Sequence, residues 1–109
     1  GARVYRATSE QRRFLHLAAV FVCNFPNALY AMAAELLERN GLPFEAMLPL
    51  IDETAAKVHQ LSPREAQTGP ARRGDTVVMQ RQRELLNGEL LDIYNLLSEY
   101  IQNTKYDKL

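Results

Sequence analysis

Three polar side chains are spaced so that one face of a helix could carry them. His16, Asn24 and Asn27 stand in a stretch that is otherwise apolar. At about 100° per residue, the eleven residues from His16 to Asn27 return to within roughly 20° of the starting direction. Leaving such groups buried and unpaired would cost about 1–3 kcal/mol each, so they pair inside the fold, pair across a subunit interface, or face a wet cleft. In a cleft, the histidine could transfer a proton and the carboxamides could orient a substrate.

A second set of candidates stands in segment 68–75, which reads Thr-Gly-Pro-Ala-Arg-Arg-Gly-Asp. Two glycines permit unusual backbone angles and a proline fixes one torsion, so we expect a rigid loop between two helices. The candidates are a hydroxyl, a glycine, a guanidinium and a carboxylate: Thr68, Gly69, Arg73 and Asp75. The loop could present these groups to a ligand or partner, although a plain helix connection also needs a glycine and a capping aspartate.

The sequence lacks the patterns of several common catalytic centres. His16, His59 and Cys23 do not have metal-ligand spacing, so we expect no metal site. Neither a glycine-flanked serine nor a cysteine-nucleophile signature is present. A dinucleotide fingerprint and a phosphate-loop lysine motif are also missing. The chain therefore has no complete catalytic apparatus of its own and binds no cofactor alone.

Composition sets the class of protein. A length of 109 residues suits one domain with a single core, and the 13 basic and 13 acidic residues cancel. This balance argues against nucleic acid and an anionic membrane as partners. The apolar run at 15–25 is interrupted by Asn24 and followed by Pro26, which makes it shorter than the roughly 20 residues of a membrane span. The single Cys23, expected to be buried and reduced, indicates a cytoplasmic protein.

Periodicity predicts an all-α helical bundle built around a long first helix. Thr8 and Gln11 form a possible capping box for a helix over 9–39, which would be roughly 46 Å long. That exceeds what a compact domain of this size needs, so we expect part of the helix to pack against another chain. Its apolar residues surround the axis between 14 and 25, which predicts that this stretch is enclosed on all sides. Pro26 should kink the helix, and Asn40-Gly41 should end it.

Shorter helices are predicted for the remainder of the chain. We expect a helix from Pro43 to Leu61 bent at Pro49, a short capped turn over 62–67, and a helix that starts at the cap Asp75 and runs to Leu86. Asn87-Gly88 should end that helix before a final amphipathic one. The expected organisation is a linker at 1–8, a helical domain at 9–104 and a frayed tail at 105–109.

Several short motifs together resemble one known family. They are His16-Leu17-Ala18-Ala19, Asn24-Phe25, Gly41-Leu42-Pro43-Phe44, Leu48-Pro49-Leu50 and the 68–75 segment. Over roughly residues 3–86 the chain resembles the helical C-terminal region of Rossmann-like proteins that carry domain of unknown function 2520. This implies a preceding Rossmann domain that binds NAD or NADP, in an arrangement similar to pyrroline-carboxylate reductases and 6-phosphogluconate-type dehydrogenases.

The resemblance also implies roles for the candidates. It implies that the helical half forms a homodimer, contacts its own Rossmann domain, and turns its first helix and the 68–75 loop toward the cofactor cleft. His16 and Asn24 become catalytic candidates; Asn27, Thr68, Gly69, Arg73 and Asp75 become substrate-binding candidates. Pro26 departs from the smooth helix expected there. The hypothesis is thus the dimerisation and active-site-completing half of an NAD(P)-dependent oxidoreductase, and the alternative is a stand-alone helical protein-interaction module without catalytic activity.

Overall fold

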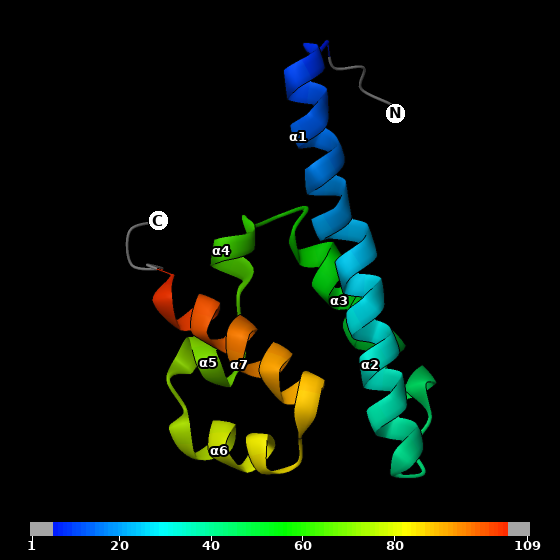
Figure 1. Ribbon diagram of the computed structural model, residues 1–109, viewed down its shortest axis with the longest axis vertical. Coiled ribbons are helices and arrows are strands. Elements are labelled where there is room, and N and C mark those ends of the chain that lie inside the picture. The colour runs from blue at the N-terminus through cyan, green and yellow to red at the C-terminus, as the bar shows by residue number, and fades with distance from the viewer. Residues whose placement is uncertain (1–5, 105–109) are drawn as a thin grey trace. The chain divides into compact units, whose positions relative to one another are not determined.

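The computed structural model describes residues 6–104, and every regular element among them is helical, which confirms the all-α prediction. The first five residues of the predicted linker 1–8, and the whole predicted tail 105–109, lie outside the described residues. Elements follow in the order α1 (Ser9–Ala19), η1 (Val20–Asn24), α2 (Phe25–Arg39), η2 (Phe44–Met47), α3 (Leu48–Lys57), α4 (Pro63–Ala66), α5 (Pro70–Arg73), α6 (Thr76–Glu84) and α7 (Gly88–Asn103) (Figure 1). They divide between two compact units, Gly1–Ala46 and Met47–Leu109. The single cooperative core stays a prediction.

The first unit consists mainly of one helix. The elements α1, η1 and α2 run on without a break as a helix of 31 residues, Ser9–Arg39, as predicted. The Thr8 hydroxyl accepts from the amide of Gln11 at 3.1 Å, and the Gln11 side chain accepts from the amide of Thr8 at 2.9 Å. This reciprocal pair satisfies two amides that a helix start leaves without partners. The capping box read from the sequence is therefore confirmed.

A π-helical turn, η1, lies in the middle of this helix, directly before Pro26. The amide of Phe25 donates to the carbonyl of Val20, five residues back instead of four. A proline ring crowds the carbonyl four residues before it, here that of Val22, and the wider turn gives this carbonyl room. Pro26 then occupies the first turn of α2, where its missing amide costs least. The proline widens one turn, and the helix continues past it.

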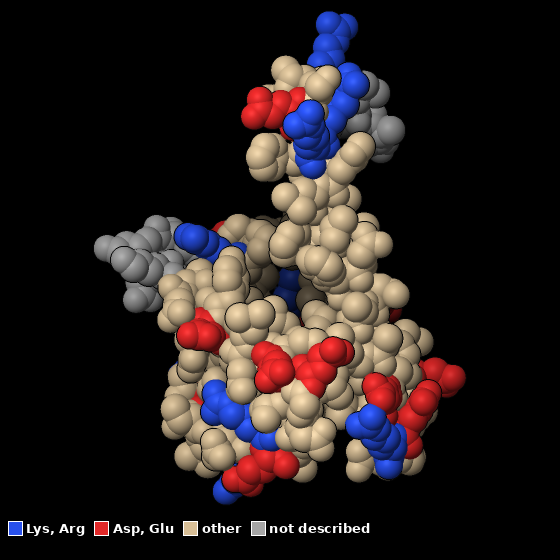
Figure 2. Space-filling model, viewed as in Figure 1, with Lys and Arg blue, Asp and Glu red and all other residues tan. Residues whose placement is uncertain are grey.

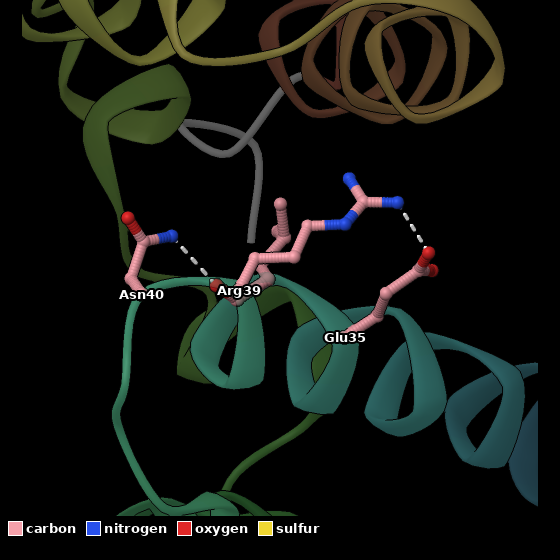
Figure 3. A network of polar contacts seen from close by, with 4 residues as sticks. Glu35, Arg39 and Asn40 are labelled. Carbon is pink, nitrogen blue, oxygen red and sulfur yellow. Dashed lines mark hydrogen bonds and ion pairs between the residues drawn. The ribbon is translucent and has the colours of Figure 1, made fainter.

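The end of α2 is closed by hydrogen bonds that its last residues dictate. Gly41 takes a left-handed φ of 71°, its amide donates to Glu38, and the amide of Leu42 donates to Leu37 at 2.9 Å. This is the glycine-ended pattern that the Asn40-Gly41 pair predicts. The side-chain amide of Asn40 also donates to the carbonyl of Leu36 at 2.8 Å, and the neighbouring Arg39 pairs with Glu35 (Figure 3).

The centre of the long helix is apolar and exposed. Residues 14–34 contain no Lys, Arg, Asp or Glu, and Figure 2 shows charged side chains near both ends of the helix with uncharged residues between them. Phe14 is 64%, Phe21 61% and Val22 70% exposed. This chain alone leaves the stretch uncovered, because a lone helix has no second layer, and enclosure by another molecule stays a prediction. Cys23, predicted to be buried, is exposed for the same reason.

The apolar helix is longer than the 15–25 run on which the membrane prediction was based. By length and composition, Ser9–Arg39 is long and apolar enough to cross a membrane. Asn24 and Pro26 were expected to keep the apolar run short, but the π-turn carries the helix past both residues. The core helix of a soluble protein passes the same test, so the property alone does not decide where the helix lies.

At the boundary between the two units, η2 and α3 stand where one bent helix was predicted. A 3-10 turn, η2, precedes α3, and Pro49 lies in the first turn of α3. A proline in a first turn removes no hydrogen bond, so this residue starts a helix here and does not bend one. The helix ends at Lys57, earlier than the predicted Leu61. The Ser62 and Glu65 capping box of α4 is present as predicted, with both bonds at 3.2 Å.

The predicted loop at 68–74 contains a one-turn helix, α5. Pro70 suits its first turn, and Gly74 closes it with a left-handed φ of 71°, its amide donating to Ala71 and that of Asp75 to Pro70. Helix α6 ends at Glu84, short of the predicted Leu86. Gly88 was expected to stop that helix, but it opens α7 instead.

The small core of the second unit lies where α5, α6 and α7 meet. One buried residue comes from each helix: Ala71, Met79 and Ser98. Met79 is 1% exposed, and its sulfur accepts a hydrogen bond from Gln102 at 3.7 Å. Two further bonds join α6 to α7, Arg83 to Asn95 at 2.9 Å and Tyr94 to Gln82 at 2.7 Å. These contacts fix the segment that carries the loop candidates.

Candidate functional site

The three helix candidates all lie in the first unit and are all exposed. His16 is in α1, Asn24 ends η1, and Asn27 is in α2. A π-turn holds more residues than an α-turn, so the uniform 100° step does not apply across η1. The angle around the helix axis between His16 and Asn27 therefore differs from the value predicted for a uniform α-helix. The sharing of one face by His16 and Asn27 stays a prediction.

The four loop candidates lie in the second unit, around α5. Thr68 and Arg73 are exposed, whereas Gly69 and Asp75 are half-buried. Gly69 precedes α5 with φ 104° and ψ 171°, a conformation that favours glycine, and no neighbouring atom would contact an added Cβ. The carboxylate of Asp75 accepts from the amide of Val78 at 3.2 Å, which confirms its predicted role as the cap of α6.

A cavity of ≈ 220 Å³ in the second unit places Thr68 beside residues of α3 and α4. It is lined by Thr54, Lys57, Val58, Pro63, Ala66, Gln67 and Thr68. Arg73 is not among these residues. The sequence reasoning missed Lys57, although Thr54, Lys57 and Val58 have the i, i+3, i+4 spacing that puts side chains on one helix face. A cation and several polar groups therefore converge at one end of the candidate loop.

Metal chemistry has no geometric support in the described part of the chain. Among residues 6–104, no group of three or more His, Cys, Asp or Glu side chains is placed to hold a metal ion. The candidates that remain are hydrogen-bonding groups and cations, which can bind and orient a substrate.

Replacing Asp75 separates its capping role from a role in ligand binding. Asp75→Ala should lower the free energy of unfolding by about 1 kcal/mol, because the amide of Val78 loses its acceptor. Asp75→Asn should keep most of that stability, since asparagine caps equally well. Urea denaturation monitored by circular dichroism measures both. If the asparagine variant is as unstable as the alanine variant, the carboxylate does more than cap.

Comparison with known proteins assigns the chain to a family. The family described as domain of unknown function (DUF2520) matches residues 1–101. The chain belongs to this family. The match covers both units of this DUF2520 chain, including every candidate residue in α1, η1, α2 and the 68–75 segment.

One similar solved structure is a crystal structure described as a "putative NADP oxidoreductase" from Bacteroides fragilis. The DUF2520 chain is 56% identical to it, with a TM-score of 0.88 over 94% of this chain and 40% of that protein. The chain thus spans less than half of the length of this relative. No curated protein matches the DUF2520 chain.

Proposed function

We propose that this DUF2520 chain is the dimerisation and active-site-completing part of an NAD(P)-dependent oxidoreductase. The observation that carries the proposal is the 56% identity to a protein described as a "putative NADP oxidoreductase", of which the chain covers 40%. Most of that relative therefore lies outside the match. The cofactor-binding Rossmann domain implied by the family resemblance would belong to that remaining part, and the name of the relative favours NADP.

The residues of this chain fit the substrate side of such an enzyme. The sequence has no glycine-rich fingerprint for a diphosphate, so it would not hold the dinucleotide by itself. When bound, the cofactor supplies the hydride. Addition of a hydride to the carbon of a C=O or C=N bond leaves the oxygen or nitrogen in need of a proton. His16 would donate that proton, and Asn24, with Asn27 nearby in sequence, would orient the substrate by hydrogen bonds.

The loop in the second unit would bind the non-reacting part of the substrate. Thr68 and Arg73 are exposed and carry hydrogen-bond donors suited to a polar or anionic group. Gly69, at φ 104°, lets the backbone leave Thr68 and enter α5 directly. Asp75 already caps α6, so its contribution would be to hold the loop in place.

The long helix would supply the dimer interface. Its centre carries no Lys, Arg, Asp or Glu over residues 14–34, and its large apolar side chains are exposed within the chain. Extended apolar surfaces of this kind mark sites of association. A second copy of the chain is the proposed cover, which a two-fold axis would place against the same surface. In that arrangement the helix is the core of a cytoplasmic dimer and not a membrane span.

Light scattering on the chain tests the dimer. Across a tenfold dilution near micromolar concentration, the mass should stay at about twice 12.4 kDa. A well-folded monomer would instead favour the alternative, a helical module that docks on a different protein. Flotation of the chain with lipid vesicles would favour membrane insertion, against the proposal.

A further inference from the structure

The cleft between α3 and α4 brings a cation to a set of hydrogen-bond donors. Lys57 lies in the last turn of α3, and Gln67 and Thr68 follow α4 directly. All three line the cavity of ≈ 220 Å³. Val58, Pro63 and Ala66 supply the apolar part of its wall. The lining therefore combines positive charge with a partly apolar enclosure.

The Lys57 and Gln67 donors in this cleft still have protons available for a ligand. The Lys57 nitrogen lies 3.7 Å from the carboxylate of Glu53, which is too long for a hydrogen bond, and both side chains are well exposed. Exposed pairs of this kind contribute little, so a ligand can replace this contact. The side-chain amide of Gln67 donates one proton to the carbonyl of Thr68 at 3.0 Å and has a second proton to offer.

The other groups in the cleft favour an oxygen anion over a cation. Neither Asp nor Glu is among the residues that line it. The hydroxyl of Thr54 donates to the carbonyl of Leu50 at 2.8 Å, so it has no proton left for an anion and is not counted among the donors. The donors available to an anion are the ammonium of Lys57, the amide of Gln67 and the hydroxyl of Thr68. Charge-assisted hydrogen bonds from an ammonium are among the stronger polar contacts in proteins.

The size of the cleft limits what can enter. A volume of ≈ 220 Å³ is below the roughly 300–1,000 Å³ of pockets that hold drug-sized ligands. At about 30 Å³ per water, it holds the equivalent of roughly seven waters. That suits a carboxylate or phosphate group with a few carbon atoms, and a dinucleotide is far too large.

We propose that this cleft binds the carboxylate or phosphate group of a small substrate, with Lys57 as its counter-charge and Gln67 and Thr68 as donors. Only the description of the ligand as a substrate rests on the proposed function. The site adds Lys57 and Gln67 to the candidates and assigns Thr68 a partner on α3 in place of Arg73.

NMR titration of the 109-residue chain with inorganic phosphate, and separately with acetate, tests the cleft. Amide signals of Lys57, Val58, Gln67 and Thr68 should shift and saturate with at least one anion. Lys57→Met should weaken binding by at least about tenfold, whereas Lys57→Arg should stay within about threefold because it keeps the charge. Thr68→Val should also weaken binding. This second variant keeps Lys57, so it tests the hydroxyl donor separately from the charge.

Arg39→Met provides the matched control, because Arg39 is also half of an exposed i, i+4 ion pair but lies at the end of α2. It should leave the affinity unchanged. Three results would contradict the proposed site: amide shifts that do not saturate, amide shifts that occur equally at every basic residue of the chain, or amide shifts that persist in Lys57→Met. The titration contains no cofactor. If no anion binds, the oxidoreductase proposal is therefore unaffected. If the parent enzyme proves inactive, the measured anion affinity is likewise unaffected.

Discussion

Phe21→Glu should convert the proposed dimer into a monomer, raising its dissociation constant by about a hundredfold or more. In the dimer, the substitution would bury a carboxylate from each chain in an apolar interface, where an unpaired charge is strongly unfavourable. In the monomer, the position is 61% exposed, so the folded chain itself should tolerate the change. The T-shaped contact of Phe21 with Phe25, at 4.9 Å between ring centres, would be lost as well.

Light scattering and sedimentation measure this change, and circular dichroism confirms that the helices persist. Leu85→Glu is the matched control, because Leu85 is 82% exposed but stands beside the charged residues that end α6. It should leave the mass at twice that of one chain. A Phe21→Glu variant that remains dimeric would place the interface away from the centre of the long helix.

His16→Ala should lower turnover of the proposed two-domain enzyme by about 10²–10⁴-fold, the usual contribution of one positioned acid or base. The assay follows NADPH oxidation with an acceptor found by screening small carbonyl and imine compounds. Because the His16 side chain is exposed within the chain and makes no hydrogen bond with the other described residues, its loss should not disturb folding. Cofactor affinity, measured by fluorescence, should be unchanged.

His59→Ala is the control for this experiment. It removes the second of the two histidines of the chain, which is also exposed but lies after α3 in the second unit. Its turnover should match that of the unmodified enzyme. Full activity in His16→Ala would remove His16 from the reaction and leave Asn24 as the catalytic candidate on the first helix.

Local hydrogen bonds were the features that the sequence predicted best. The caps at Thr8, Ser62 and Asp75 each depend on residues three positions apart, so their pattern is visible without any tertiary information. Pro49 and Gly88 were assigned the wrong roles because the same residue can end one helix or begin the next. What decides between these roles is packing with distant segments, which a local pattern does not contain.

Burial and the cleft were harder to predict, for two different reasons. The apolar pattern of residues 14–25 predicts a surface that needs a cover, but the pattern does not say which molecule provides it. Lys57 and Thr68 are brought together by the path of the chain through α4, so their proximity follows from tertiary structure. Only the shared face of Thr54, Lys57 and Val58 could have been read in advance.

The π-turn and Pro26 together change the hydrogen-bond ladder of the long helix. Phe25, four residues after Phe21, gives its amide proton to Val20, and Pro26, five residues after it, has none to give. The carbonyl of Phe21 is therefore left without either of its usual helical donors. The regular hydrogen-bond pattern of the helix therefore changes within the apolar surface, next to Phe21. A partner that buries the carbonyl of Phe21 would need to offer it a donor or a water molecule, which restricts the surfaces that can pack there.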